Sequence, residues 1–125
     1  MKITITGRGL RKNEVLFTCK YGEGKGIWCG ANVAAQEEYE VEFELPVLLM
    51  RWIDILPADS GENRICREAD GTVFTGRLDN IEEDGTGFLG MDNEFIMFES
   101  LGEPMALGTF VSLKAAEVQI YPVSN

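Results

Sequence analysis

Residues 37–45, which read EEYEVEFEL, alternate acidic and apolar side chains from Glu38 to Leu45. Successive side chains of a β-strand point to opposite faces of the sheet, so this alternation predicts a strand with one buried and one exposed face. The predicted buried face consists of Tyr39, Val41, Phe43 and Leu45. The predicted exposed face consists of Glu38, Glu40, Glu42 and Glu44.

The four glutamates form a ladder of like charge, because side chains two residues apart on a strand are separated by about 6.6–6.8 Å. Their mutual repulsion costs stability unless cations on a neighbouring strand or on a partner relieve it. Two interpretations stay open. The ladder is either a solvated face that protects a strand against edge pairing or a surface that attracts a basic partner.

Less regular alternation extends the strand prediction to most of the chain. β-Branched and aromatic residues are frequent in five further runs, at residues 2–6, 14–20, 72–78, 94–100 and 110–122. Glycine-rich or Asp-Gly segments separate the runs, at residues 21–26, 58–63, 69–71, 83–87 and 101–104. We therefore predict an all-β, mainly antiparallel protein, a small barrel or sandwich with at most one or two short helices. The length predicts a single domain over residues 1–125.

Residues 46–56 are compatible with either a strand or a helix. The apolar residues of this segment recur at helical spacing, and Pro46 could occupy the first position of a helix. We favour a strand, because Pro57 ends the apolar run and the neighbouring segments are strands. Residues 32–38 are a second, weaker helix candidate, in which Asn32 would cap the helix.

The net charge of −10, from 21 acidic and 11 basic residues, limits the classes of partner. An acidic protein repels nucleic-acid backbones and anionic membranes, so we expect a basic protein partner and neither nucleic acid nor membrane. The amino terminus lacks the apolar core of a signal peptide, and we predict a cytoplasmic protein. The sequence does not decide the oligomeric state.

Metal binding and catalysis find little support in the residue types. Three cysteines and no histidine favour reduced, mostly buried thiols over a disulfide framework or a zinc site. The absence of histidine also removes the most common general base. We predict no catalytic residues, no enzyme activity, no metal and no cofactor.

An acid-rich segment, GRLDNIEEDGTGF at residues 76–88, is the other candidate site. Its acids could bind calcium, but Ile81 occupies a position where the helix-loop-helix calcium site requires Asp or Asn. We favour a solvated hairpin turn at Asp84 and Gly85. The residues that would bind a ligand, if the segment is a site, are Asn80, Glu82, Asp84 and Gly85.

Two known families resemble parts of this sequence. The order of strands and turns in residues 72–122, with Gly108 before the last long strand, resembles the oligonucleotide/oligosaccharide-binding (OB) barrels, which bind ligands on an open sheet face. Residues 80–88 resemble the turn of PilZ domains, with matches at Asn80 and Gly85 and with Glu82 in place of serine. The PilZ resemblance implies binding of a cyclic dinucleotide by an arginine pair, for which the nearest match, Arg64 and Arg67, has a different spacing.

These observations lead to two hypotheses of function. In the first, the protein is a non-catalytic acidic module that masks a basic surface of a protein partner, and an immunity-type role against a basic toxin is its most specific form. In the second, it is a regulatory β-barrel of the PilZ or OB type that binds a small ligand or a nucleotide.

Overall fold

The computed structural model describes residues 1–123, in which all regular secondary structure is β-strand and no helix occurs. The prediction of the all-β class is therefore confirmed. The strands are β1 (Lys2–Arg8), β2 (Glu14–Cys19), β3 (Gly22–Trp28), β4 (Glu38–Glu44), β5 (Leu49–Met50), β6 (Ile55–Pro57), β7 (Arg64–Glu68), β8 (Gly71–Ile81), β9 (Thr86–Met91), β10 (Glu94–Leu101), β11 (Phe110–Ala115) and β12 (Gln119–Pro122).

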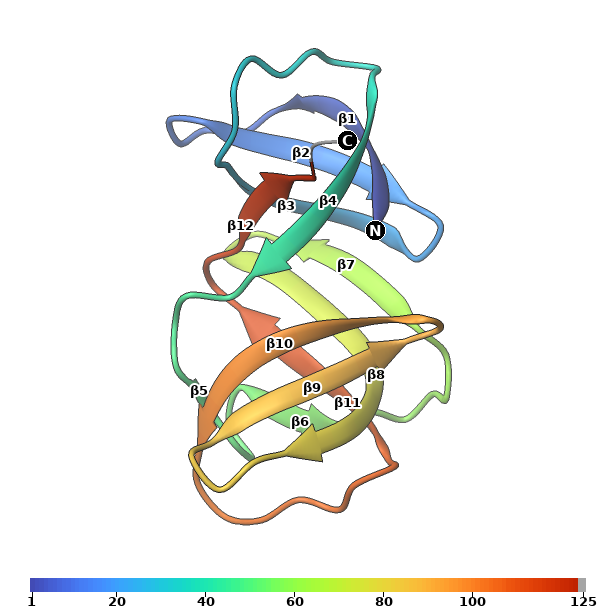
Figure 1. Ribbon diagram of the computed structural model, residues 1–125, viewed down its shortest axis with the longest axis vertical. Helices are drawn as coiled ribbons and strands as arrows, with labels where there is room; N and C mark the ends of the chain where they lie inside the picture. The colour runs from blue at the N-terminus through green and yellow to red at the C-terminus, as the bar shows by residue number, and fades with distance from the viewer. Residues whose placement is uncertain (124–125) are drawn as a thin grey trace.

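Five of these strands form a closed barrel, drawn at the top of Figure 1. The antiparallel pairs β1–β2, β2–β3, β1–β4 and β4–β12 make a curved sheet. Parallel pairing of β12 with β3 closes the barrel, with Gln119 opposite Ile27 and Ile120 opposite Trp28. The closed barrel is thus built from residues 2–44 and 119–122, and its predicted location in residues 72–122 is wrong.

The glycines of β3 explain why its sequence was difficult to interpret. The segment YGEGKG at residues 21–26 predicts a turn, but the structure places most of it in the strand. A side chain at Gly24 would begin 2.4 Å from the ring of Phe17, and one at Gly26 would begin 2.9 Å from the carbonyl oxygen of Val118. Glycine is required in this strand because large neighbours fill the small barrel from the opposite side.

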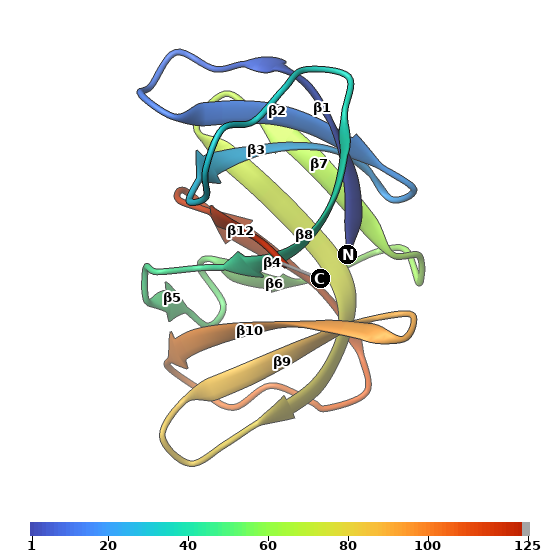
Figure 2. The ribbon, with the colours of Figure 1, turned by 45° about the horizontal axis from the view of Figure 1, so that its top comes forward.

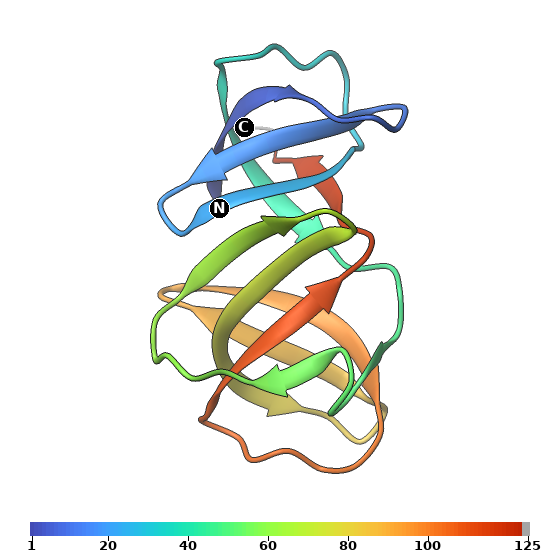
Figure 3. The same ribbon diagram turned by 180° about the vertical axis from the view of Figure 1, so that it is seen from behind.

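The remaining strands continue the sheet below the barrel as a curled extension around the long strand β8, which we call the second sheet. Parallel pairing of β7 with β3, at Ile65 and Gly22, joins this extension to the barrel. The first part of β8 pairs with β7, its second part pairs with β9, and β11 pairs along its other edge. β10 continues the sheet beyond β9, and β6 continues it beyond β11. Figure 3, seen from behind, shows β11 in front, running from the lower sheet towards β12.

Three predicted elements differ from the structure. Residues 110–122 divide into β11 in the second sheet and β12 in the barrel, because Ala116–Val118 carry the chain from one sheet to the other. Residues 46–56 form the short strands β5 and β6 around a turn at Trp52, whose φ is 72°, and not one continuous strand or a helix. The helix considered for residues 32–38 is absent, since these residues form a loop with Gln36 at φ 67° and the start of β4.

The barrel and the second sheet share one continuous hydrophobic core. The ring of Phe43 on β4 lies 5.4 Å from that of Phe17 in the barrel and 5.6 Å from that of Phe74 in the second sheet. Val41 and Leu45 are buried, Tyr39 and Phe43 are partly buried, and the intervening glutamates are exposed. The predicted alternation of residues 37–45 is therefore confirmed.

The cysteines differ from the prediction of mostly buried thiols. All three are free, but Cys66 is exposed and Cys19 and Cys29 are partly buried. Cys66 lies on β7, where its side chain points away from the core that contains Ile65. Since residues 1–123 contain no helix, they contain no helical segment that could cross a membrane.

Candidate binding groove between the barrel and the second sheet

The predicted acidic face lies on β4, between β1 and β12. Glu38, Glu40, Glu42 and Glu44 are all exposed. The residues opposite them on the neighbouring strands are Thr4 and Lys2 on β1 and Tyr121 and Gln119 on β12. The side chain of Lys2 is therefore the one basic side chain among these directly opposite residues.

A groove runs beside this face, between β4 of the barrel and β10 of the second sheet. One cavity of about 560 Å³ is lined by residues of both strands, including Glu40, Glu42, Phe95 and Met97. A second cavity of about 370 Å³ shares Glu42, Phe43 and Met97 with the first. We call the two cavities together the β4–β10 groove, and Figure 2 shows the two strands facing each other across the middle of the molecule.

Carboxylates dominate the charge of the β4–β10 groove. Neither cavity is lined by a lysine or arginine side chain within the described part of the chain. The five carboxylates that line the two cavities are Glu40, Glu42 and Glu44 of β4 and Glu94 and Glu99 of β10. Their field attracts cations and repels nucleic-acid phosphates.

Apolar side chains are exposed along the same groove. Phe95 is 62% exposed, Met97 is 51% exposed and Tyr121 is 38% exposed. Phe95 is held by edge-to-face contact with Phe88 on β9, at 5.5 Å between ring centroids. Large apolar side chains beside charged ones are typical of protein-binding surfaces.

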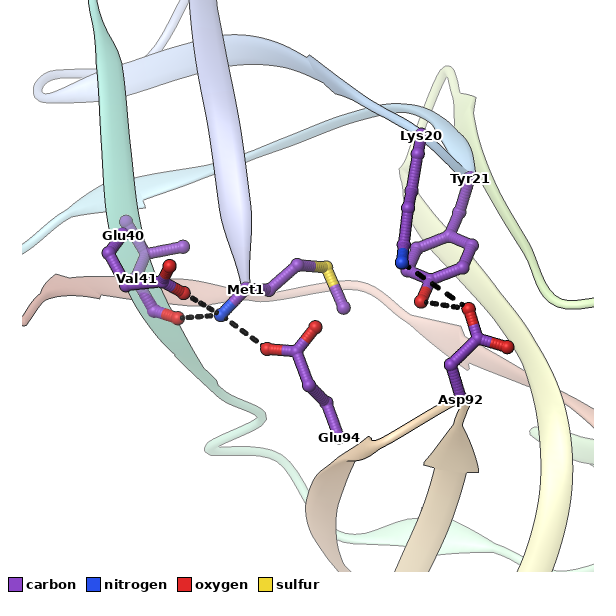
Figure 4. A network of polar contacts seen from close by, with 7 residues as sticks. All are labelled: Met1, Lys20, Tyr21, Glu40, Val41, Asp92 and Glu94. Carbon is purple, nitrogen blue, oxygen red and sulfur yellow. Dashed lines mark hydrogen bonds and ion pairs between the residues drawn. The ribbon is translucent and has the colours of Figure 1, made fainter.

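One end of the groove already holds a cation, the amino-terminal ammonium of Met1. Figure 4 shows this group between β4 and β10, 2.5 Å from a carboxylate oxygen of Glu40 and 2.6 Å from one of Glu94. The ammonium also donates a hydrogen bond of 2.8 Å to the carbonyl oxygen of Val41. This hydrogen-bonded ammonium lowers the pKa of Glu40. For Met1, burial lowers the pKa of the ammonium, but the contacts with both carboxylates outweigh burial and raise it.

A second polar network fixes the β9–β10 turn to the barrel beside the groove. The hydroxyl of Tyr21 donates to Asp92 at 2.6 Å, and the ammonium of Lys20 lies 3.5 Å from the same carboxylate (Figure 4). Asn63 donates to the other oxygen of Asp92 at 3.1 Å. The hydrogen bond from Tyr21 is the main cause of the lowered pKa of Asp92. These contacts set the position of the start of β10 relative to the barrel.

The acid-rich segment forms the hairpin between β8 and β9, as predicted. The N–H of Gly85 donates to Glu82 O, and the N–H of Glu82 donates to Thr86 O. Gly85 has a φ of 94°, whereas Asp84 accepts a hydrogen bond from the N–H of Thr86. The turn is therefore a three-residue loop with glycine in the left-handed region, and not the two-residue turn in which Asp84 would also have positive φ.

The four residues named for a ligand lie on this hairpin, away from the arginines of the PilZ resemblance. Asn80 is exposed near the end of β8, and Glu82 and Asp84 are exposed in the turn, whereas Gly85 is buried. Arg64 pairs with Thr75 on the other part of β8, about 16 Å from Asn80 along the strand. The structure does not bring the arginines and the turn together.

The β10 wall of the groove was not predicted. The sequence predicts a strand at residues 94–100, but its alternation does not show which side chains face solvent, because Phe95 and Met97 on the exposed face are as apolar as Ile96 and Phe98 on the buried face. The signal available in the sequence is the pair Glu94 and Glu99, which flank the apolar residues.

Within residues 1–123, no group of three or more His, Cys, Asp or Glu side chains is arranged to hold a metal ion. Comparison of the chain with protein-family models, with curated proteins and with solved structures finds no match.

Proposed function

We propose that the protein is a non-catalytic acidic binding module that masks a basic surface of a protein partner. The observation that carries this proposal is the β4–β10 groove, in which five carboxylates and exposed apolar side chains lie together, with no lysine or arginine side chain among the described residues that line it. The carboxylates would attract the partner over a distance, and Phe95, Met97 and Tyr121 would supply apolar contact after the encounter.

Charge steering gives this proposal a kinetic test. Lowering the salt concentration lengthens the Debye length from about 8 Å at physiological ionic strength to about 30 Å at 0.01 M. We expect association with the basic partner to accelerate steeply at low salt, while dissociation changes little. The partner is to be captured from the native host at low salt, and its binding kinetics are then measured across a salt series.

The charge-reversal variant Glu42→Lys/Glu44→Lys tests whether the groove is responsible. Neither residue forms an ion pair in the described structure, so the reversal leaves the contacts of Met1 intact. The matched control, Glu82→Lys/Glu83→Lys, makes the same change in net charge on the exposed hairpin. The groove variant should associate more slowly than the control and show a flatter salt dependence. Equal kinetics for the two variants, or an acidic or neutral partner, would contradict the proposal.

An immunity-type role is the specific form of this function that we favour. A protein that covers a toxic enzyme with a basic active surface needs an acidic face and apolar anchors, both of which the groove offers, and an acidic face favours fast association with a basic partner. The corresponding test is whether a neighbouring gene encodes a basic toxin and whether this chain inhibits it.

The second hypothesis, ligand binding by a regulatory barrel, is supported by the topology. The strand order β1–β2–β3–β12–β4, with a parallel closing pair, resembles that of OB barrels. No aromatic residue lies on the exposed side of β2 or β3, where OB barrels stack bases, and this weakens the hypothesis. A rise in melting temperature with oligonucleotides or a cyclic dinucleotide, but not with cationic peptides, would favour ligand binding over the masking of a basic partner.

A further inference from the structure

Within residues 1–123, most of the edge of β10 that faces the groove has no strand partner. β10 pairs with β9 from Glu94 to Glu99, whereas on its other side it pairs with β5 only at Ser100 and Leu101. β4 approaches β10 but makes no backbone pairing with it in the described structure. The segment from Phe95 to Glu99 is therefore an open sheet edge beside the groove.

The direction of the backbone groups follows from the last two residues of the strand, Ser100 and Leu101. Ser100 donates its N–H to the carbonyl oxygen of Gly85, on the β9 side, while the carbonyl oxygen of Leu101 accepts from Arg51, on the β5 side. Backbone groups alternate along an antiparallel strand. The N–H groups of Phe95, Met97 and Glu99 and the C=O groups of Phe95 and Met97 therefore point towards the open edge.

We propose that this edge takes up an extended segment of a cationic protein partner as an added strand in the β4–β10 groove. The inference rests on the proposed function, because it specifies how the basic partner binds. The backbone groups of the open edge would hold the segment by main-chain hydrogen bonds, and the groove would select its side chains.

The charges of the groove favour a cationic strand over a second copy of this chain. An open edge is a site for pairing between identical molecules unless charge prevents it. Glu94 and Glu99 lie on β10 itself, and Glu40, Glu42 and Glu44 face it, so a second acidic copy would be repelled. The ammonium of Met1 between Glu40 and Glu94 shows how a lysine of the partner could be held by carboxylates of both walls.

Amide hydrogen exchange tests the inference without any change in the protein. The probe is a capped peptide in which lysine and valine alternate, because alternate side chains of an added strand point to opposite sides. The control peptide has proline in place of the central valine and the same charge, and proline lacks the N–H that strand pairing needs. In the free protein, the amides of Phe95, Met97 and Glu99 should exchange fast and those of Ile96 and Phe98 slowly.

The alternating peptide should slow exchange at Phe95, Met97 and Glu99 by about tenfold or more, because these amides gain hydrogen bonds. Met97→Pro removes one edge donor while leaving the pairing with β9 in place, and should weaken this peptide about two- to tenfold. Met97→Ala, which keeps the N–H, is its matched variant and separates the backbone effect from loss of the side chain.

The possible results separate the inference from the proposed function. Salt-dependent binding of both peptides with equal affinity, or binding without protection of the three amides, would overturn strand addition and leave the acidic binding function standing. Failure of both peptides to bind at low salt would count against both proposals. In the absence of peptide, protection of the three amides could increase with protein concentration. This result would show that two copies of the chain pair through this edge, and it would overturn the proposal that a cationic partner occupies it.

Discussion

Phe43→Ala is the most direct test of how β4 joins the two parts of the molecule. Truncation of a fully buried phenylalanine lowers the free energy of unfolding by about 3–5 kcal/mol. Phe43 is only partly buried, so we expect the loss of its burial to cost about 3 kcal/mol or less. The ring also contacts Phe17 and Phe74, and aromatic pairs contribute about 0.5–1.5 kcal/mol each beyond area burial. We expect a loss of about 2–4 kcal/mol in the free energy of unfolding.

Thermal and urea unfolding measure this loss against two controls. At about 4 °C for each kcal/mol in a domain of this size, the melting temperature should fall by about 8–16 °C. Glu42→Ala should stay within about 0.5 kcal/mol of the wild type, because its side chain points to solvent. Phe43→Leu should recover more than half of the loss, since it keeps most of the volume. Equal destabilisation by Glu42→Ala and Phe43→Ala would refute the assignment of the two faces.

Three further substitutions test the turns beside the core. Gly85→Ala should lower the free energy of unfolding by about 1–3 kcal/mol, because of the positive φ and of a contact of the new side chain with the carbonyl oxygen of Ser100; Asp84→Asn keeps an acceptor for the turn and should leave the urea midpoint unchanged. The pKa of Asp92 lies below its ordinary value of 3.8, chiefly because of Tyr21, so its stabilising contribution is complete above that pH and lost as the pH falls through the folded pKa. Asp92→Asn should therefore melt below the wild type at neutral pH, and a difference that persists in strong acid would contradict this account.

The sequence predicts local structure here better than it predicts which strands pair. Alternation of Glu and apolar residues predicts β4 and its buried face, because successive side chains of a strand point to opposite faces and the apolar ones are buried. The glycines of β3 predict a turn when considered alone, because the residues that require them, Phe17 and Ile120, are brought there only by the fold.

For the candidate site as well, the sequence predicts one wall of the groove but not the other. The glutamates of β4 are evident in the sequence, and their exposure follows from parity. The opposite wall, with Phe95 and Met97, depends on how the second sheet packs below the barrel, which no local pattern encodes. The pairing of β3 with β12 likewise depends on contacts between residues far apart in the chain.

The closure of the barrel by β12 has a consequence for how the protein is made. The parallel partners of residues 27 and 28 are residues 119 and 120, which are synthesised only after the whole second sheet. Until then the parallel edge of β3 and the outer edge of β4 at Val41–Glu44 stay unpaired on the ribosome. Pairings between distant residues slow folding and lengthen exposure to aggregation. The glutamates of β4 would then protect the nascent chain before they meet any partner, because like charges keep unfinished edges apart.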